Sequence, residues 1–340
     1  MKPFLKVVML LSLFTILVSC NSNPIEPEPQ PGRRDYVWTA DTLKLPYGEF
    51  ATISEIWGSD PNNIWASGSG SSNQYRLWHY SNGNWNNIEI GFSILDARKL
   101  FGFNNSNIWL GTALGIIAHY DGIKWTSFGN LSPSGEILVI QGLWGISATD
   151  LYAFGFLDKQ DRTGYRGCIM KYNGSKWSFL SIDTLSLNFL SMGYDKDAQK
   201  YFLHAYQSES GKQFIYELSG NKLTKLLESK EETKVFNMNN KVYFMVGKKI
   251  YKYSKKDGLY VWKDFSSFTI YAGIFEGRSE KDIFTINWGG IGHYNGDDIV
   301  MLFQTDLWFM DSILFDKEIF VACKNFQTGV NVIVRGKVKN

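Results

Sequence analysis

A pattern of about 43 residues recurs along the chain, and it restricts the fold more than any other feature of the sequence. The first half of each clear copy has an apolar–aromatic pair, a polar turn ending in Asn or Asp, and a second apolar–aromatic pair; it occurs at residues 56–66, 100–110, 143–153 and 274–285. The second half, a Tyr followed by a Gly turn, occurs at residues 77–85, 118–125, 170–177 and 292–299. Trp57, Phe101 and Trp144 lie 44 and 43 residues apart. Four short strands fill a period of this length.

The residue pattern within each copy predicts β-structure throughout. Aromatic and β-branched residues alternate with small or polar ones, which is typical of strands, and Asn-Gly and Asp-Gly pairs supply the positive φ angles of tight turns. One four-stranded sheet cannot bury both of its faces, but a ring of packed sheets can. We therefore expect the tryptophans of the repeat, such as Trp57, Trp65, Trp85, Trp109 and Trp125, to fill the spaces between sheets.

The end of the repeat array predicts how the ring closes. Weaker copies continue in phase at 192–220 and 235–258, and a seventh copy supplies three strands up to residue 337. Its fourth strand is missing, whereas residues 35–45 form a strand pattern that precedes the first copy. The sequence thus predicts an all-β, seven-bladed β-propeller at residues 35–340, in which the N-terminal strand completes the C-terminal blade.

These repeats resemble those of bacterial cell-surface propellers, in which Trp-Gly-Ser, Asp-Val-Trp-Ala-Val-Gly, His-Tyr-Asp-Gly and Trp follow in order. They lack the Gly-His and Trp-Asp signatures of WD40 repeats and the Ser-x-Asp-x-Gly-x-Thr-Trp box of sialidases. The resemblance covers nearly all of residues 35–340 and implies the propeller fold. Because the function of most of these propellers is unknown, it implies no activity.

The N-terminus has the pattern of an export signal. Lys2 and Lys6 precede an apolar run that is too short to span a bilayer, and the run ends at Leu-Val-Ser before Cys20. This resembles the bacterial lipobox, which implies a signal peptide at residues 1–19 and a diacylated Cys20. The proline-rich residues 20–34 then read as a tether. We expect a lipoprotein of the cell envelope that is anchored in the outer membrane. The sequence does not distinguish between its periplasmic and its surface-exposed side.

Charge and cysteine content restrict the partners. Removing Lys2 and Lys6 from the 35 Lys and Arg leaves 33, equal to the 33 Asp and Glu. A neutral mature chain lacks the basic face that nucleic acid requires. Cys168 and Cys323 fall in different predicted blades and are expected to be small buried hydrophobes, with a disulfide as the alternative. The sequence predicts a monomer without cofactor or metal.

Catalytic chemistry is the alternative hypothesis. A propeller glycosidase needs two carboxylates at a set separation, and Glu55, Asp96, Glu136, Glu276 and Asp311 lie near predicted inner strands. The sequence alone does not show whether these carboxylates lie close together in the fold. The three His-Tyr histidines occupy one repeat position on separate blades, so they should not share a metal ion; they are His79, His119 and His293.

Long connections between second and third strands are the predicted binding surface. The candidate loops are 68–76, 155–167, 206–212 and 324–329. Two of them carry Tyr and Arg, the residue types enriched at binding hot spots, namely Tyr75, Arg76, Arg162, Tyr165 and Arg166. The leading hypothesis is a non-catalytic envelope scaffold that binds a protein or glycan on this loop face; the alternative is a surface carbohydrate-active enzyme.

Overall fold

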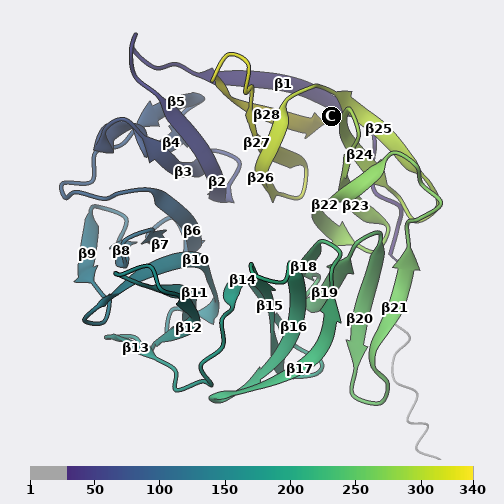
Figure 1. Cartoon of the computed structure of the whole chain (residues 1–340). Coiled ribbons are helices and arrows are strands. Elements are labelled where there is room, and N and C mark those ends of the chain that lie inside the picture. Colours follow the sequence, from purple (N-terminus) through teal and green to yellow (C-terminus); the bar gives the residue numbers. More distant parts are fainter. Residues whose placement is uncertain (1–28, 340) are drawn as a thin grey trace, which may run out of the picture.

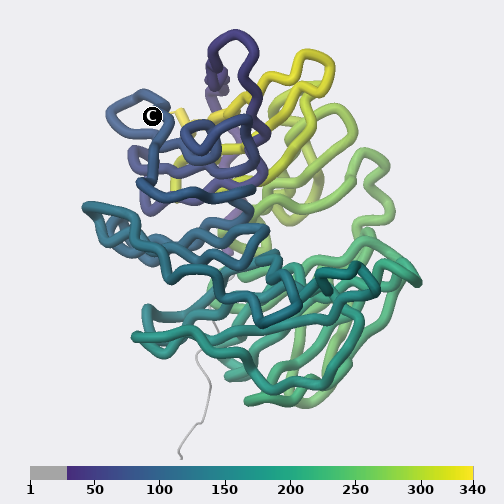
Figure 2. Tube along the Cα trace, turned by 60° about the vertical axis from the view of Figure 1, so that its left-hand side comes forward, coloured from purple at the N-terminus to yellow at the C-terminus, as the bar shows by residue number. Residues whose placement is uncertain are grey.

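The computed structural model describes residues 29–339, and these form a closed ring of seven four-stranded antiparallel sheets (Figure 1). The predicted seven-bladed propeller is confirmed. The chain passes from blade to blade in sequence order around the ring (Figure 2). The predicted signal peptide and Cys20 lie outside the described residues.

The blades that follow the N-terminal strand are numbered in chain order, and each runs from its inner to its outer strand. Blades one to four are β2 (Ala51–Asp60), β3 (Asn63–Gly70), β4 (Leu77–Ser81), β5 (Asn84–Asn87); β6 (Ala97–Asn104), β7 (Asn107–Thr112), β8 (Ile116–Tyr120), β9 (Trp125–Asn130); β10 (Glu136–Ser147), β11 (Asp150–Lys159), β12 (Tyr165–Tyr172), β13 (Trp177–Phe179); and β14 (Asn188–Asp195), β15 (Lys200–Gln207), β16 (Lys212–Ser219), β17 (Lys222–Ser229).

Blades five and six continue the order, and blade seven combines both ends of the chain. Their strands are β18 (Thr233–Met238), β19 (Lys241–Val246), β20 (Lys249–Ser254), β21 (Gly258–Asp264); β22 (Tyr271–Ser279), β23 (Asp282–Asn287), β24 (Gly290–Tyr294), β25 (Ile299–Gln304); and β26 (Trp308–Leu314), β27 (Glu318–Lys324), β28 (Asn331–Val338), β1 (Tyr36–Leu43).

The N-terminal strand closes the ring as predicted. β1 pairs with β28 along its whole length, from Tyr36 opposite Val338 to Leu43 opposite Asn331. Without β1, the outer edge of β28 would present unpaired backbone groups. The first and last strands of the fold are therefore hydrogen-bonded neighbours.

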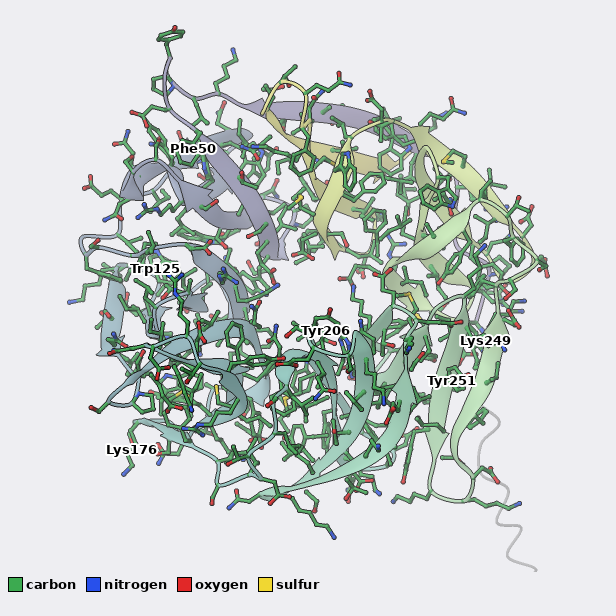
Figure 3. The ribbon with its side chains drawn as sticks, in the orientation of Figure 1. Phe50, Trp125, Lys176, Tyr206, Lys249 and Tyr251 are labelled. Carbon is green, nitrogen blue, oxygen red and sulfur yellow. The ribbon has the colours of Figure 1, made fainter. Side chains whose placement is uncertain are left out.

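Aromatic rings pack in the seams between blades, as predicted for the repeat tryptophans. Trp65 of blade one meets Trp125 of blade two edge to face, with 5.6 Å between ring centroids. Trp109 and Trp177 repeat this contact at the next seam. Gly102 leaves room for an indole, because a Cβ there would lie 2.6 Å from the ring of Trp57. Figure 3 shows side chains filling the spaces between neighbouring blades.

A polar pair joins the second and third strands of six blades. In three of them a histidine Nε2 lies 2.8–3.0 Å from an Asn or Asp oxygen: His79–Asn63, His119–Asn107 and His293–Asp282. At the same register position the other three have salt bridges with N···O distances of 2.6–2.7 Å: Lys171–Asp150, Lys200–Glu217 and Arg335–Glu318. The three histidines are thus repeat positions with structural partners within their own blades.

The ring has two distinct faces. One face, which we call the loop face, carries the joins between second and third strands and the connections between blades; the other, the turn face, carries the remaining turns. Residues 32–34 lie against the turns of blade six. The Gly32 amide donates to the Lys281 carbonyl at 2.7 Å, and Arg34 donates to Asp298 and to the His293 carbonyl. The chain therefore enters the propeller from the turn face.

Both remaining cysteines are free and buried, with Cys168 3% and Cys323 1% exposed. This confirms that they are small buried hydrophobes. Burial raises the pKa of each thiol to about 12, so neither carries appreciable thiolate at neutral pH.

Candidate functional sites

Three of the five predicted carboxylates converge in the centre of the ring, together with two lysines. Glu55 on β2, Lys99 on β6 and Asp311 on β26 occupy one register position, each directly after a β-bulge. Lys234 holds the same position on β18, and Glu276 follows a bulge on β22. The inner strands surround the centre of the ring (Figure 1). The five side chains interact electrostatically with one another, so they form a charged cluster across five blades. The sequence pattern identified the acids but not the lysines.

The contacts within this channel cluster are mainly between blades. Lys99 Nζ lies 2.5 Å from Glu55 Oε2, and Asp311 Oδ2 accepts the Ile56 amide at 2.9 Å. Lys234 Nζ is 3.4 Å from the Phe275 carbonyl. Two acids are thus held to the neighbouring blade, a structural role that stiffens the ring.

Burial inside the ring perturbs the titration of all three acids. Desolvation raises the pKa of Glu55 to about 8, although Lys99 opposes the rise. It raises the pKa of Glu276 to about 7, with Lys234 opposing and Asp311 adding to the rise, and it raises the pKa of Asp311 as well. Strongly shifted carboxyl groups occur at catalytic sites and in structural networks alike.

Asp96 and Glu136 lie away from this cluster, each paired with an arginine. Asp96 binds Arg98 at 2.7 Å in the connection between blades one and two. Glu136 accepts both the Nε and Nη2 protons of Arg166 at 2.8 Å, and these hydrogen bonds lower the pKa of its carboxyl. Within residues 29–339, no group of three or more His, Cys, Asp or Glu side chains is arranged to hold a metal ion.

The long loop predicted in blade three is mostly strand, so that prediction is wrong. β11 continues to Lys159 and β12 begins at Tyr165, which leaves residues 160–164 as the connection instead of 155–167. The predicted loops of blades one and four are also shorter than expected: strand structure ends at Gly70 and Gln207 and, in blade four, resumes at Lys212. Polar strand ends explain the error, because a hairpin can continue its backbone ladder with exposed side chains.

The predicted binding residues of blade three lie on the loop face, but two of the three make hydrogen bonds with other parts of the protein. Tyr165 Oη lies 2.8 Å from Ser208 Oγ and donates to Glu209, so it bridges blades three and four. Arg166 is held by Glu136, as described above. Arg162 is exposed at the tip of the connection, in a left-handed conformation with φ of 57°.

The predicted residues of blade one are structural. The Tyr75 side chain is 6% exposed and belongs to the core between blades seven and one, which excludes it from contact with a partner at the rim. Arg76 donates to the Gly70 and Ile94 carbonyls and to Asn73 Oδ1, which fixes the connection between blades one and two. Tyr75 therefore does not belong to an exposed loop-face rim, and that part of the prediction is corrected.

Sequence reasoning missed a group of exposed aromatic side chains on the loop face. They come from the connections and strand starts of blades six, seven and one, and we call them the aromatic sector: Trp288 (74% exposed), Trp308 (66%), Phe326 (59%), Phe50 (60%) and Tyr47 (fully exposed). Trp308 and Phe326 touch edge to face at 5.5 Å. These residues fall outside the aromatic positions of the repeat, and that departure is the signal that could have revealed them.

Comparisons with known proteins support the fold. No family model and no curated protein matches the chain. Among solved structures it is similar to YCF48 bound to D1 peptide (TM-score 0.62, 14% identity, 92% of this chain and 98% of that one) and to the Neurospora crassa Pan2 WD40 domain (TM-score 0.61, 9% identity, 92% and 98%). YCF48 from Cyanidioschyzon merolae is similar at 11% identity with a TM-score of 0.56, over 88% of this chain and 98% of that one. The part of the chain that the structure describes contains no helix long and apolar enough to cross a membrane.

Proposed function

We propose that this chain is a non-catalytic lipoprotein of the cell envelope, anchored through Cys20, whose propeller binds a protein partner on its loop face. The observation that carries the proposal is the aromatic sector. Five large aromatic side chains from three adjacent blades stand at least 59% exposed on one face. Trp308 and Phe326 touch each other, and water solvates exposed aromatic surface poorly, so their grouping on one face favours an interaction site.

The composition of the sector favours a polypeptide partner over a glycan. Trp, Tyr and Phe are enriched in protein interfaces, where their rings bury large areas. The sector residues stand exposed on connections and at the start of β26, whereas small-ligand sites are concave and enclose their ligand. The solved structure of YCF48 with a bound peptide shows a propeller of this shape holding a polypeptide.

The path of the N-terminal segment supports a partner surface that faces away from the membrane. Residues 32–34 lie on the turn face of blade six, opposite the loop face. An extended chain covers at most about 3.5 Å per residue, so residues 20–31 could span at most about 40 Å. A membrane reached through Cys20 would then lie on the side of the turn face, and the aromatic sector would point away from it.

A capture experiment tests the proposal. The full-length protein and a variant with Trp288→Ser, Trp308→Ser and Phe326→Ser would be used to isolate partners from envelope extracts, with identification and quantification by mass spectrometry. The control carries Ile123→Ser and Ile146→Ser, which remove exposed apolar side chains from the turn face.

We expect one polypeptide to be captured by the parent and the control, to be lost at least tenfold in the aromatic variant, and to rebind when purified. Equal capture by parent and aromatic variant, at equal melting temperature, would refute a partner site on the sector. If capture depends on a glycan attached to the isolated protein, the propeller recognises that carbohydrate and not the polypeptide.

The channel cluster favours a second candidate function, a carbohydrate-active enzyme. Its three carboxylates, two of them with a pKa near neutrality, are the groups that glycoside hydrolysis uses. The Lys99 and Ile56 contacts that hold Glu55 and Asp311 argue for structure instead. Release of reducing ends from envelope polysaccharide by the parent, abolished in Glu276→Gln and in Asp311→Asn, would establish the enzyme.

A further inference from the structure

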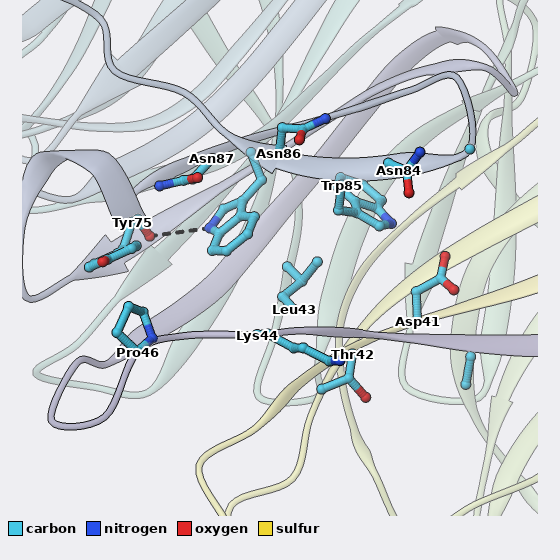
Figure 4. A pocket seen from close by; sticks show the side chains of 13 residues that line it. Asp41, Thr42, Leu43, Lys44, Pro46, Tyr75, Asn84, Trp85, Asn86 and Asn87 are labelled. Atoms are coloured by element: carbon cyan, nitrogen blue, oxygen red, sulfur yellow. Dashed lines mark hydrogen bonds between the residues drawn. The ribbon is translucent and has the colours of Figure 1, made fainter.

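Blades seven and one enclose a groove on the outer rim of the ring, between β1 and β5 (Figure 4). Pro46, at one end of its lining, directly precedes Tyr47 of the aromatic sector. The volume of the groove is about 720 Å³, within the usual range of about 300–1,000 Å³ for small-ligand sites. β5 forms one wall, and β1 with the residues that follow it forms the other; the side chains that matter here are Asp41, Thr42, Asn86, Asn87 and Trp85.

The seam between blades seven and one departs from the repeat at one aromatic position. At the next two seams the second strand supplies a tryptophan, Trp65 or Trp109, that packs against the outer-strand tryptophan of the following blade. Blade seven has Phe320 at this position, and the Phe320 ring contacts Tyr80 at 6.1 Å. Trp85 stays partly exposed at this seam, whereas its equivalents Trp125 and Trp177 are 8% exposed.

The groove walls carry polar groups that the protein itself leaves unused. Among residues 29–339, the structure shows no side-chain hydrogen bond for Asp41, Thr42, Asn86 or Asn87. Successive side chains alternate between the two faces of a strand, so Asp41 and Asn87 are the two that share the faces of Leu43 and Trp85 (Figure 4). They offer a carboxylate acceptor and an amide that both donates and accepts. Asp41 is the acid and Lys44 the base that line the groove, so neither sign of charge dominates.

We propose that this groove binds a neutral oligosaccharide. A sugar has hydroxyl groups that donate and accept at once, which matches the Asn87 amide and the Asp41 carboxylate, and its apolar ring face can lie against the indole of Trp85. An amphipathic helix would need an apolar groove, and a phosphorylated ligand would need a cluster of basic side chains. The groove has neither, and its open form suits a chain of several sugar units.

Titration calorimetry of the full-length protein with maltohexaose, cellohexaose and chitohexaose tests the assignment. The variant Asp41→Ala with Asn87→Ala removes two groove groups that make no side-chain hydrogen bond or ion pair among the described residues. Thr126→Ala is the control, since Thr126 is exposed on β9, away from the groove, and makes no side-chain hydrogen bond among the described residues. We expect at least one hexasaccharide to bind the parent and the control equally, and the double variant at least tenfold more weakly.

Three outcomes would overturn the proposal: no hexasaccharide binding at millimolar concentration, equal binding by parent and double variant, or equal weakening in the control. Loss of polypeptide capture in the double variant, without sugar binding by the parent, would assign the groove to the protein partner. The aromatic-sector variant should bind sugar like the parent, so failure of the proposed function and failure of this site are distinguishable.

Discussion

Replacing Glu276 with Gln should stabilise the propeller at alkaline pH and leave it almost unchanged under mildly acidic conditions. Glu276 lies in the channel cluster, and the described residues give its carboxylate no hydrogen bond or ion pair at close range. Burial raises its pKa from 4.5 to about 7. The folded state therefore holds a proton on Glu276 over a pH range in which the unfolded chain has lost it.

The sign of the effect follows from proton linkage. Between about pH 4.5 and pH 7 the folded state binds more protons than the unfolded state, so this group lowers stability as pH rises. A tenfold difference in proton affinity between the two states corresponds to about 1.4 kcal/mol of folding free energy. The destabilisation by ionised Glu276 therefore has an upper limit of about 3 kcal/mol. We expect Glu276→Gln to raise the free energy of unfolding by about 1–3 kcal/mol above about pH 8. For roughly 300 residues this corresponds to a rise of about 2–5 °C in melting temperature.

Thermal melts of parent and variant at about pH 5 and pH 8 would measure this difference. Glu280→Gln, in the same blade, is the matched control with the opposite sign. Glu280 accepts hydrogen bonds from Tyr243 and Lys252 at 2.7 and 2.6 Å, and these outweigh burial and lower its pKa. Its removal should therefore destabilise at pH 8. A Glu276→Gln variant that is destabilised at both pH values, or shifted equally at both, would refute the electrostatic reasoning.

Two further predictions concern the ends of the chain. Cys20→Ser should abolish labelling by a fatty-acid probe in cells, and retained label would exclude the lipid anchor at this residue. Deleting residues 36–43 should remove the strand that closes the ring and expose the edge of β28; we expect the melting temperature of the remaining chain to fall by more than 10 °C, and coincident melts of deleted and intact protein would contradict the role of β1 in closure.

The fold could be predicted because its information is local and repeated. The Trp-Gly and Tyr-x-Gly positions mark strands and turns. The last repeat has only three strands, and residues 36–43 form a strand that belongs to no other repeat, so β1 must complete the last blade. The strand ends around Lys159 and Tyr165 were mistaken for loop because exposed strand residues are as polar as loop residues.

The candidate sites were predicted less well because they depend on side-chain direction and on contacts between blades. Residue type alone suggested Tyr75 for binding, yet its ring is buried. The convergence of Glu55, Glu276 and Asp311 depends on bulges that re-aim inner-strand side chains. The groove beside Trp85 lies between β1 and β5, which belong to different blades. No single stretch of sequence contains such relations.

The strand that closes the ring is also the strand to which the proposed tether is attached, and this has a mechanical consequence. A pull transmitted from Cys20 would first load the contacts of Gly32 and Arg34 with blade six. Beyond them it would act along β1, parallel to its axis, so that the eight residue pairs with β28 resist together in shear instead of opening one at a time. A partner held on the loop face would thus be coupled to the membrane through the most force-resistant geometry that a pair of β-strands offers.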